Sequence, residues 1–176
     1  APGVQSAIPG NDAAGGLSVS CASVGNCTVV GQFQNASWGA LEAFTATSTG
    51  SVWGAATPVT FVSGVQAVGS SQDSLFSVSC ASAGDCSAGG EFVNAAANRE
   101  AFTVTSTGGT WGQATPVAFA SGVQAAVHDD VIYSMSCASS GNCTAVGQFN
   151  NASSLNEAFT VTSTGGMWGE AMPLTF

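Results

Sequence analysis

The chain repeats one pattern three times, and this repetition constrains the fold more than any other feature of the sequence. Each copy contains Ser-Cys-Ala-Ser, a second Cys, Gly-x-Phe, Glu-Ala-Phe-Thr and Trp-Gly. Equivalent first cysteines are 59 and 57 residues apart, and the tryptophans are 58 and 57 apart. A fixed period of this length predicts a repeat architecture, in which each unit buries its apolar face against its neighbours. We predict one repeat domain over residues 1–176, with units at approximately 3–63, 64–121 and 122–176.

Each unit is predicted to form a four-stranded antiparallel sheet, so the fold class is all-β. Apolar residues alternate with serine from Phe76 to Cys80, which is the two-residue period of a strand. The second strand is expected from Cys86 to Phe92 and the third from Glu100 to Ser106, and the fourth includes Val117 and Phe119. Ser-Thr-Gly-Gly sequences in the second and third units supply hairpin turn residues.

The six cysteines form one pair in each unit. Five residues separate the members of a pair, and Gly-Asn or Gly-Asp precedes the second cysteine. A hairpin turn there brings two strand ends within disulfide reach, and so short a loop stabilises the fold by roughly 2 kcal/mol. Metal binding is the alternative, but this spacing with a single His fits no standard zinc site. The predicted disulfides, which imply an oxidising compartment and a secreted or cell-surface protein, are Cys21–Cys27, Cys80–Cys86 and Cys137–Cys143.

The repeated pattern resembles a known group of bacterial repeats. Cys-Ala-Ser-x-Gly-Asn-Cys-Thr-x-Val-Gly, followed by a Phe-Thr-Val strand and a Trp-Gly turn, is similar to tandem repeats of secreted actinobacterial proteins. Those repeats carry Ser-Cys-x-Ser-x-x-x-Cys-x-Ala-Val-Gly and then a Trp, and they look like β-propeller blades. The resemblance covers essentially the whole chain. It implies an architecture rather than an activity, because a fold does not fix a function.

Three blades are fewer than the four or more that a closed propeller needs. Phe61 and Phe119 each stand three positions before the Gly of a Gly-Val-Gln, and Phe176 has the same relation to Gly3 when the chain ends are joined. This register favours a six-bladed ring made by two copies of the chain, a homodimer similar in this respect to some small bacterial lectins. The alternatives are a β-trefoil or β-prism with internal threefold symmetry, or an open array cut from a longer protein.

The charge balance restricts the class of partner. Arg99 is the only Lys or Arg, against ten carboxylates, and the net charge is −9 at pH 7. Nucleic acid is therefore excluded by repulsion from its phosphates, and anionic membrane surfaces are disfavoured for the same reason. No apolar run is long enough to insert into a membrane. Neutral ligands such as glycans, a surface protein, and cations are the partners that remain.

Three residue types recur in every unit and are candidates for ligand binding. A Glu accepts hydrogen bonds from sugar hydroxyls, and a Trp face stacks on a sugar ring. The structural alternatives are a strand-start hydrogen bond for Glu, a cover over the core edge for Trp, and a turn for Asn. Trp38 has no counterpart in the other units and is a candidate exposed contact. The full candidate set is Glu42, Glu100, Glu157, Trp38, Trp53, Trp111, Trp168, Asn35, Asn94 and Asn151.

An aspartate precedes the first strand of each unit, at Asp12, Asp73 and Asp130. If these connections meet at one mouth of a ring, their carboxylates could hold Ca²⁺, and no other cofactor is expected. Solvated loop carboxylates are the alternative.

His128-Asp129-Asp130 is the one cluster of catalytic residue types. His128 has no repeat partner, and no nucleophile motif surrounds any serine, so we expect no enzyme. The sequence instead predicts a secreted binding module, lectin-like, with equivalent carbohydrate sites in each repeat. A structural or protein-interaction segment of a larger cell-surface protein is the alternative.

Overall fold

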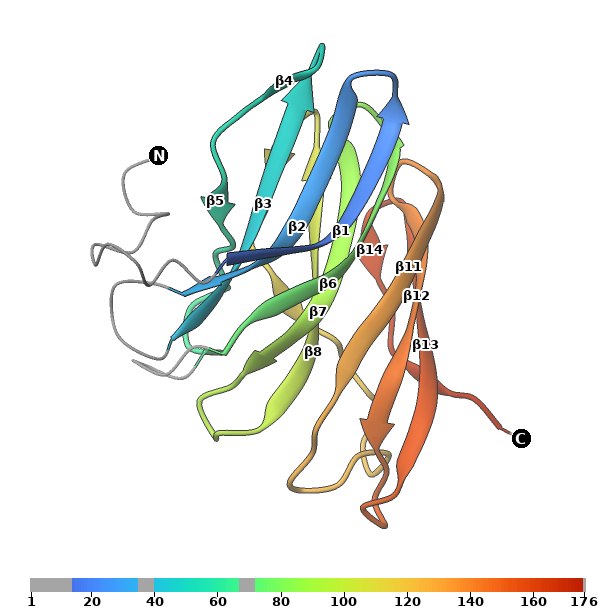
Figure 1. The fold of residues 1–176 in the computed structure, drawn as a ribbon. Helices are drawn as coiled ribbons and strands as arrows, with labels where there is room; N and C mark the ends of the chain where they lie inside the picture. The colour runs from blue at the N-terminus through green and yellow to red at the C-terminus, as the bar shows by residue number, and fades with distance from the viewer. Residues whose placement is uncertain (1–13, 35–39, 67–71, 176) are drawn as a thin grey trace.

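Three antiparallel β-sheets follow one another along the chain (Figure 1). The computed structural model describes residues 14–34, 40–66 and 72–175. These ranges contain strands and turns but no helix, and hence no helix able to span a membrane. Each sheet has three long strands and two short outer ones, so the all-β fold of repeated antiparallel sheets is confirmed.

The strands occupy equivalent positions in the three sheets. Sheet 1 contains β1 (Ala14–Ser23), β2 (Asn26–Gln34), β3 (Leu41–Thr49), β4 (Val52–Trp53) and β5 (Thr57–Pro58). Sheet 2 contains β6 (Ser74–Ser82), β7 (Asp85–Val93), β8 (Arg99–Thr107), β9 (Thr110–Trp111) and β10 (Thr115–Pro116). Sheet 3 contains β11 (Val131–Ser139), β12 (Asn142–Asn150), β13 (Asn156–Thr164), β14 (Met167–Trp168) and β15 (Met172–Pro173).

The disulfides join the first two strands of each sheet and confirm the predicted pairing. The two cysteines of each pair are direct cross-strand partners, and their Cα atoms lie 3.9–4.0 Å apart. None of the six cysteines is free. Each bridge therefore fixes the register of a hairpin whose turn carries a glycine with positive φ, such as Gly84.

The Gly-x-Phe motif requires glycine for a steric reason. A Cβ added to Gly90 on β7 would lie 1.8 Å from the carbonyl oxygen of Ser74 on β6. A Cβ added to Gly31 or Gly147 would lie 1.9 Å from the equivalent carbonyl oxygen. The ladder shifts register at the same place, between Leu75 and Ser77. Only glycine allows the two strands to approach this closely at the bulge.

The predicted fourth strand is wrong in its extent. Only β10 forms in that region, and the short strand β9 comes before it, with the Gly112 amide donating to the Thr105 carbonyl at 3.0 Å between them. Val117 adds one hydrogen bond to Ala101, and Phe119 then leaves sheet 2 for an isolated bridge to Ala171 of sheet 3. After the turn, Phe119 is partly buried and packs against the core of the next unit.

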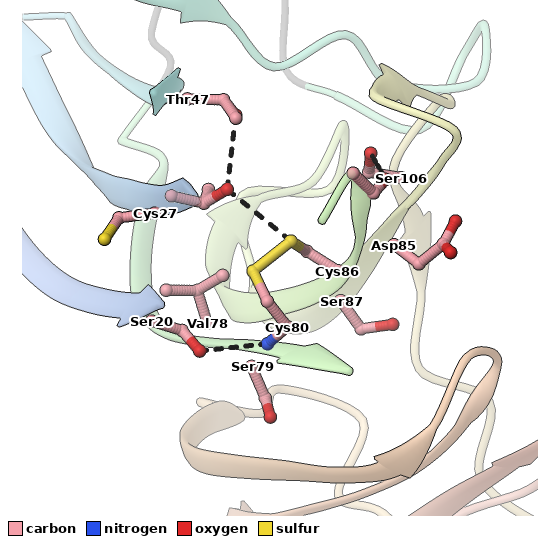
Figure 2. Close-up of a disulfide and its surroundings, with 12 residues drawn as sticks. Ser20, Cys27, Thr47, Val78, Ser79, Cys80, Asp85, Cys86, Ser87 and Ser106 are labelled. Carbon is pink, nitrogen blue, oxygen red and sulfur yellow. Dashed lines mark hydrogen bonds between the residues drawn. A yellow bond between two sulfur atoms is a disulfide. The ribbon is translucent and has the colours of Figure 1, made fainter. Parts of the chain in front are cut away.

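The sheets stack face to face, with β1, β6 and β11 packed along one another. Serine hydroxyls link these strands across the sheet boundary. The Cys80 amide donates to Ser20 Oγ at 3.0 Å (Figure 2). The Cys137 amide donates to Ser79 Oγ at 2.9 Å. The repeated Ser-Cys pair thus serves both the hairpin and the stacking.

Each junction between sheets has its own apolar core. Between sheets 1 and 2, Phe61 packs on Phe92 and Phe102, with ring centroids 4.8 Å from each. Between sheets 2 and 3, Phe119 packs in the same way on Phe149 and Phe159, at 5.0 and 5.1 Å. The first and second units therefore each place their C-terminal tail against the core of the next unit. The three sheets do not close on themselves, and the six-bladed ring stays a prediction.

Candidate functional site

A groove follows the junction between sheets 1 and 2. It comprises three adjoining cavities of about 360, 390 and 180 Å³. The first and third cavities share Thr47 and Gly109, and the second and third share Thr45, Thr57 and Trp111. The groove thus extends from the Trp111 ring to the Cys80–Cys86 disulfide.

The lining of this groove carries no charged side chain. Its polar groups are Thr and Ser hydroxyls, the peptide groups of the β8–β9 turn at Gly108 and Gly109, one amide side chain and one indole, and Ala, Val, Pro and Cys side chains complete the lining. Such a surface offers hydrogen-bond donors and acceptors with an apolar plate at one end. A ligand with many hydroxyl groups and no charge matches this chemistry.

Cross-strand hydrogen bonds orient the hydroxyls. Thr28 Oγ1 lies 3.2 Å from Thr47 Oγ1 and 3.5 Å from the Cys86 sulfur. Farther along the groove, Thr45 Oγ1 lies 3.4 Å from Thr57 Oγ1. Thr28 and Thr45 are buried, whereas Thr47 and Thr57 reach the surface. The outer hydroxyl of each pair is therefore held in place and remains accessible.

The recurring tryptophans cover the edges of the inter-sheet cores. Trp111 packs against the core between sheets 1 and 2, and Trp168 against the core between sheets 2 and 3. Trp168 Nε1 also donates to Thr105 Oγ1 of the preceding sheet at 3.5 Å. Trp53 is 51% exposed, since within the described residues no sheet precedes sheet 1. Of the three, Trp111 lines the groove described above.

The recurring asparagines and glutamates meet at the loop between the second and third strands. Asn94 Oδ1 accepts the amides of Ala96 and Asn98 at 2.8 and 2.9 Å, while its Nδ2 donates to Glu100 Oε1 at 2.6 Å. Asn151 holds Glu157 in the same way, also at 2.6 Å. Asn94 and Glu100 line a separate, open cavity of about 270 Å³. Their polar atoms are largely engaged in shaping this loop.

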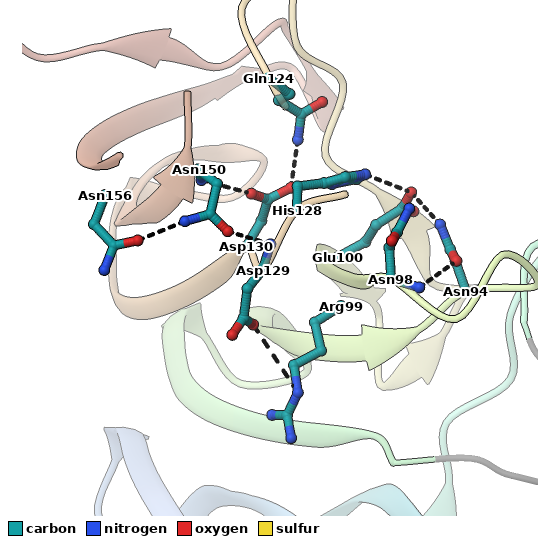
Figure 3. Close-up of polar contacts among 10 residues, drawn as sticks. All are labelled: Asn94, Asn98, Arg99, Glu100, Gln124, His128, Asp129, Asp130, Asn150 and Asn156. Carbon is teal, nitrogen blue, oxygen red and sulfur yellow. Dashed lines mark hydrogen bonds and ion pairs between the residues drawn. The ribbon is translucent and has the colours of Figure 1, made fainter. Parts of the chain in front are cut away.

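One histidine joins two carboxylates at the junction of sheets 2 and 3 (Figure 3). His128 Nδ1 lies 3.0 Å from Asp130 Oδ2, and Nε2 lies 3.7 Å from Glu100 Oε1. The His128 side chain is 11% exposed. Glu100 is the partner that sequence reasoning missed. Both ring nitrogens face carboxylates, with Nδ1 at hydrogen-bonding distance and Nε2 beyond it.

The connection aspartates are buried rather than solvated. Burial raises the pKa of Asp73 to about 7, assisted by the Glu42 charge and opposed by Gln66 and the Val93 amide. Asp73 Oδ2 accepts from Gln66, but its buried Oδ1 has no partner at hydrogen-bonding geometry.

In the next unit, burial raises the pKa of Asp130 to about 6, opposed chiefly by the His128 charge. Its Oδ1 accepts the Asn150 amide at 3.2 Å, and Gln124 donates to Oδ2.

The described part of the chain brings together no metal site. Asp73 binds Gln66 and Asp130 binds Gln124, each by a side-chain hydrogen bond, and the three-aspartate Ca²⁺ site stays a prediction. No group of three or more His, Cys, Asp or Glu in residues 14–34, 40–66 and 72–175 suits a metal ion. Asp12, with Asn35 and Trp38 of the ligand-binding set, lies outside the described residues.

Arg99, the one strong cation, is already paired. Its Nη1 lies 2.5 Å from Glu91 Oε1, and its Nε lies 4.0 Å from Asp129 Oδ1. Burial raises the pKa of Glu91, and the Arg99 charge opposes this shift. The pair leaves no free Lys or Arg for an anionic ligand, since the sequence contains no other.

Comparison with known proteins identifies a fold but no family. No protein-family model matches the chain, and no curated protein matches it by sequence. Among solved structures, the Hadza microbial sialidase Hz136 is similar, with a TM-score of 0.65 at 12% identity. The match covers 98% of this chain and 40% of that chain, so the three sheets span less than half the length of the sialidase. At this identity the likeness concerns the fold alone.

Proposed function

We propose that the protein is a secreted, non-catalytic carbohydrate-binding module whose ligand lies in the groove between sheets 1 and 2. The observation that carries this proposal is the uncharged lining of the groove, in which threonine hydroxyls and glycine peptide groups lead to the Trp111 indole. Sugar hydroxyls pair with such groups, and the apolar face of a sugar ring packs against an aromatic ring. The three disulfides support an oxidising, extracellular setting.

The electrostatics favour a neutral sugar over an acidic one. The chain carries a net charge of −9, and its single Arg is paired with Glu91. A carboxylated or sulfated sugar would therefore meet repulsion and find no cation. The fold shared with a sialidase is compatible with a carbohydrate-related role, although the ligand of this chain is assigned from its own groove.

We propose that the protein is not catalytic because of where its carboxylates lie. Glycoside cleavage uses two carboxylates held on either side of a scissile bond. The groove itself carries no carboxylate. The Glu100 and Asp130 carboxylates face His128 instead, where Asp130 is 1% exposed.

A glycan array followed by calorimetry tests the proposal. The wild-type protein is expected to bind a neutral oligosaccharide. Thr47→Val and Thr57→Val, which keep the shape but remove the surface hydroxyls, are each expected to weaken binding of that sugar about threefold to tenfold, since one hydrogen bond is worth roughly 1 kcal/mol. Thr175→Val, an exposed threonine outside the groove, is the matched control. No binding to any neutral glycan, or unchanged affinity in both groove variants, would refute this function.

A protein-interaction role is the second candidate function. The end sheets leave apolar side chains exposed, among them Val19 on sheet 1 and Val146 on sheet 3. Apolar patches of this kind mark contact surfaces. This role and glycan binding use different surfaces of the molecule.

A further inference from the structure

Sheet 1 leaves open a face that is covered on the other two sheets. Val19, Val78 and Met135 occupy equivalent positions on β1, β6 and β11. Val78 and Met135 are 6% and 8% exposed because the preceding sheet covers them, whereas Val19 is 61% exposed. Met135 is covered as Val78 is, although the residue type differs. The greater exposure of Val19 therefore comes from the missing neighbouring sheet rather than from the residue type.

Sheet 3 leaves open the opposite face. Val30, Gly89 and Val146 are equivalent on β2, β7 and β12. Val30 is fully buried and Gly89 is buried, because the following sheet covers them, but Val146 is 42% exposed. The adjoining hydroxyl position follows the same rule, since Thr28 and Ser87 are buried and Thr144 is exposed.

Inside the chain these two faces interlock position by position. Val30 of sheet 1 shares one core cluster with Leu75 and Val78 of sheet 2. At the next junction, a Cβ on Gly89 would lie 2.9–3.1 Å from the side chains of Ile132 and Met135. The smaller residue on sheet 2 thus accommodates the larger pair on sheet 3. The open faces of sheets 1 and 3 are the two halves of this same contact.

The hydrogen bonds between β1, β6 and β11 follow the same pattern as the apolar side chains. Ser20 accepts the Cys80 amide and Ser79 accepts the Cys137 amide. The next hydroxyl in this series is Ser136 on β11, which is exposed. The next amide in the opposite direction is that of Cys21 on β1, at the other end of the stack.

The C-terminal tails give a third line of support. Val59 packs against the core between sheets 1 and 2, and Val117 packs against the core between sheets 2 and 3. Leu174 is their equivalent in sheet 3 and is 40% exposed. The tail residue thus packs against the next core in the first two units, but in the last unit its equivalent, Leu174, lies outside both cores.

We infer that a second copy of this chain covers both open faces. Sheet 3 of each copy stacks on sheet 1 of the other copy, as sheet 1 stacks on sheet 2 within the chain. The second copy is the occupant because it carries both complementary faces, which continue the two interfaces already present. One heterologous contact, made twice about a twofold axis, gives a closed pair of six sheets.

This pairing would also build two more grooves between sheets. Trp53 of one copy would lie at the edge of sheet 3 of the other, as Trp111 lies at the edge of sheet 1. The pairing itself does not depend on the proposed carbohydrate binding, because it concerns faces rather than grooves. A mass measurement without any sugar therefore separates the two proposals.

Light scattering after size-exclusion chromatography tests the inference. At about 100 µM chain and ~150 mM salt, where surface repulsion is screened, the wild type is expected to have twice the chain mass of 17.2 kDa. Val19→Glu and Val146→Glu are each expected to give a single-chain mass. Both side chains are exposed in the single chain, so the substitutions leave its fold intact, which near-ultraviolet circular dichroism checks. Val24→Glu, at a side chain 98% exposed in the β1–β2 turn, is the control that keeps the double mass.

Mixing the two variants distinguishes the head-to-tail contact from other dimers. In the mixture, one of the two contacts joins two wild-type faces, so partial recovery of the double mass is expected. A single-chain mass for the wild type, a double mass for either variant alone, or an open series of larger masses would overturn the closed pair. So would a mixture that shows no recovery.

Discussion

Val78 and Val19 form a natural matched pair for measuring what the stacking contributes to stability. They are the same residue type at the same position of the repeat, but Val78 is covered by sheet 1 and Val19 is mostly exposed. Val→Ala removes two methyl groups. At about 0.8 kcal/mol for each buried carbon, plus the remaining cavity, Val78→Ala should lower the free energy of unfolding by about 2 kcal/mol. Val19→Ala, with less than half of its side chain covered, should lower it by under ~0.7 kcal/mol.

Urea unfolding measures both values, with the disulfides intact and the protein at ~1 µM to disfavour pairing. Unchanged m-values would show that the variants differ from the wild type in stability alone. Equal losses for the two variants would refute the reasoning, because the local strand is the same in both units. A loss below ~0.5 kcal/mol at Val78 would equally mean that sheet 1 does not cover sheet 2.

Three further predictions concern stability. Burial raises the pKa of Asp73 to about 7, so the folded state binds this proton more tightly than the unfolded state, and the free energy of unfolding should fall as pH rises from about 4 to 7. Asp73→Asn should reduce this decline, which is worth at most ~4 kcal/mol, in thermal melts across that pH range. An unchanged pH profile would contradict the assignment. Gly90→Ala should lower the free energy of unfolding by about 3 kcal/mol or more, because the added Cβ meets a carbonyl oxygen. Gly15→Ala, whose Cβ meets nothing within 4 Å, should leave this free energy nearly unchanged. Similar losses in the two variants would disprove the close approach at Gly90. Replacing both Cys80 and Cys86 by Ser should lower the unfolding free energy by roughly 2 kcal/mol, and an unaltered value would show that the bridge does not constrain the unfolded chain.

Local features of the fold follow directly from the sequence. The disulfide pairs could be predicted because six-residue separation and a Gly-Asn or Gly-Asp turn leave the two strand ends side by side. The long strands could be predicted from the alternation of apolar and polar residues.

The relations between units were harder to predict from residue patterns. The strand pattern assigns Phe119 to its own sheet, yet Phe119 packs on Phe149 and Phe159 of the next sheet. Apolar alternation shows that a side chain is buried but not which sheet buries it. The aspartates were placed in solvated loops or a metal site, whereas Gln66 and Gln124 bind Asp73 and Asp130 in buried connections.

The candidate groove was also outside the sequence prediction, except for Trp111. Two of its hydroxyls come from the Thr-x-Thr alternation of β3, which the sequence displays at Thr45 and Thr47. That alternation is the normal outward face of a strand. Only the approach of sheet 2 turns it into the wall of a groove, so spacing within one unit cannot reveal it.

The central claim is that the three disulfide-bonded sheets stack on one another through their first strands. Nuclear Overhauser effects in isotope-labelled protein test it most directly, between the Ser20 Hβ and Cys80 amide protons and between the Ser79 Hβ and Cys137 amide protons. The hydrogen bonds of 3.0 and 2.9 Å predict that both effects are observed. Their absence, with the effects inside each sheet intact, would mean that the units fold separately and would contradict the account.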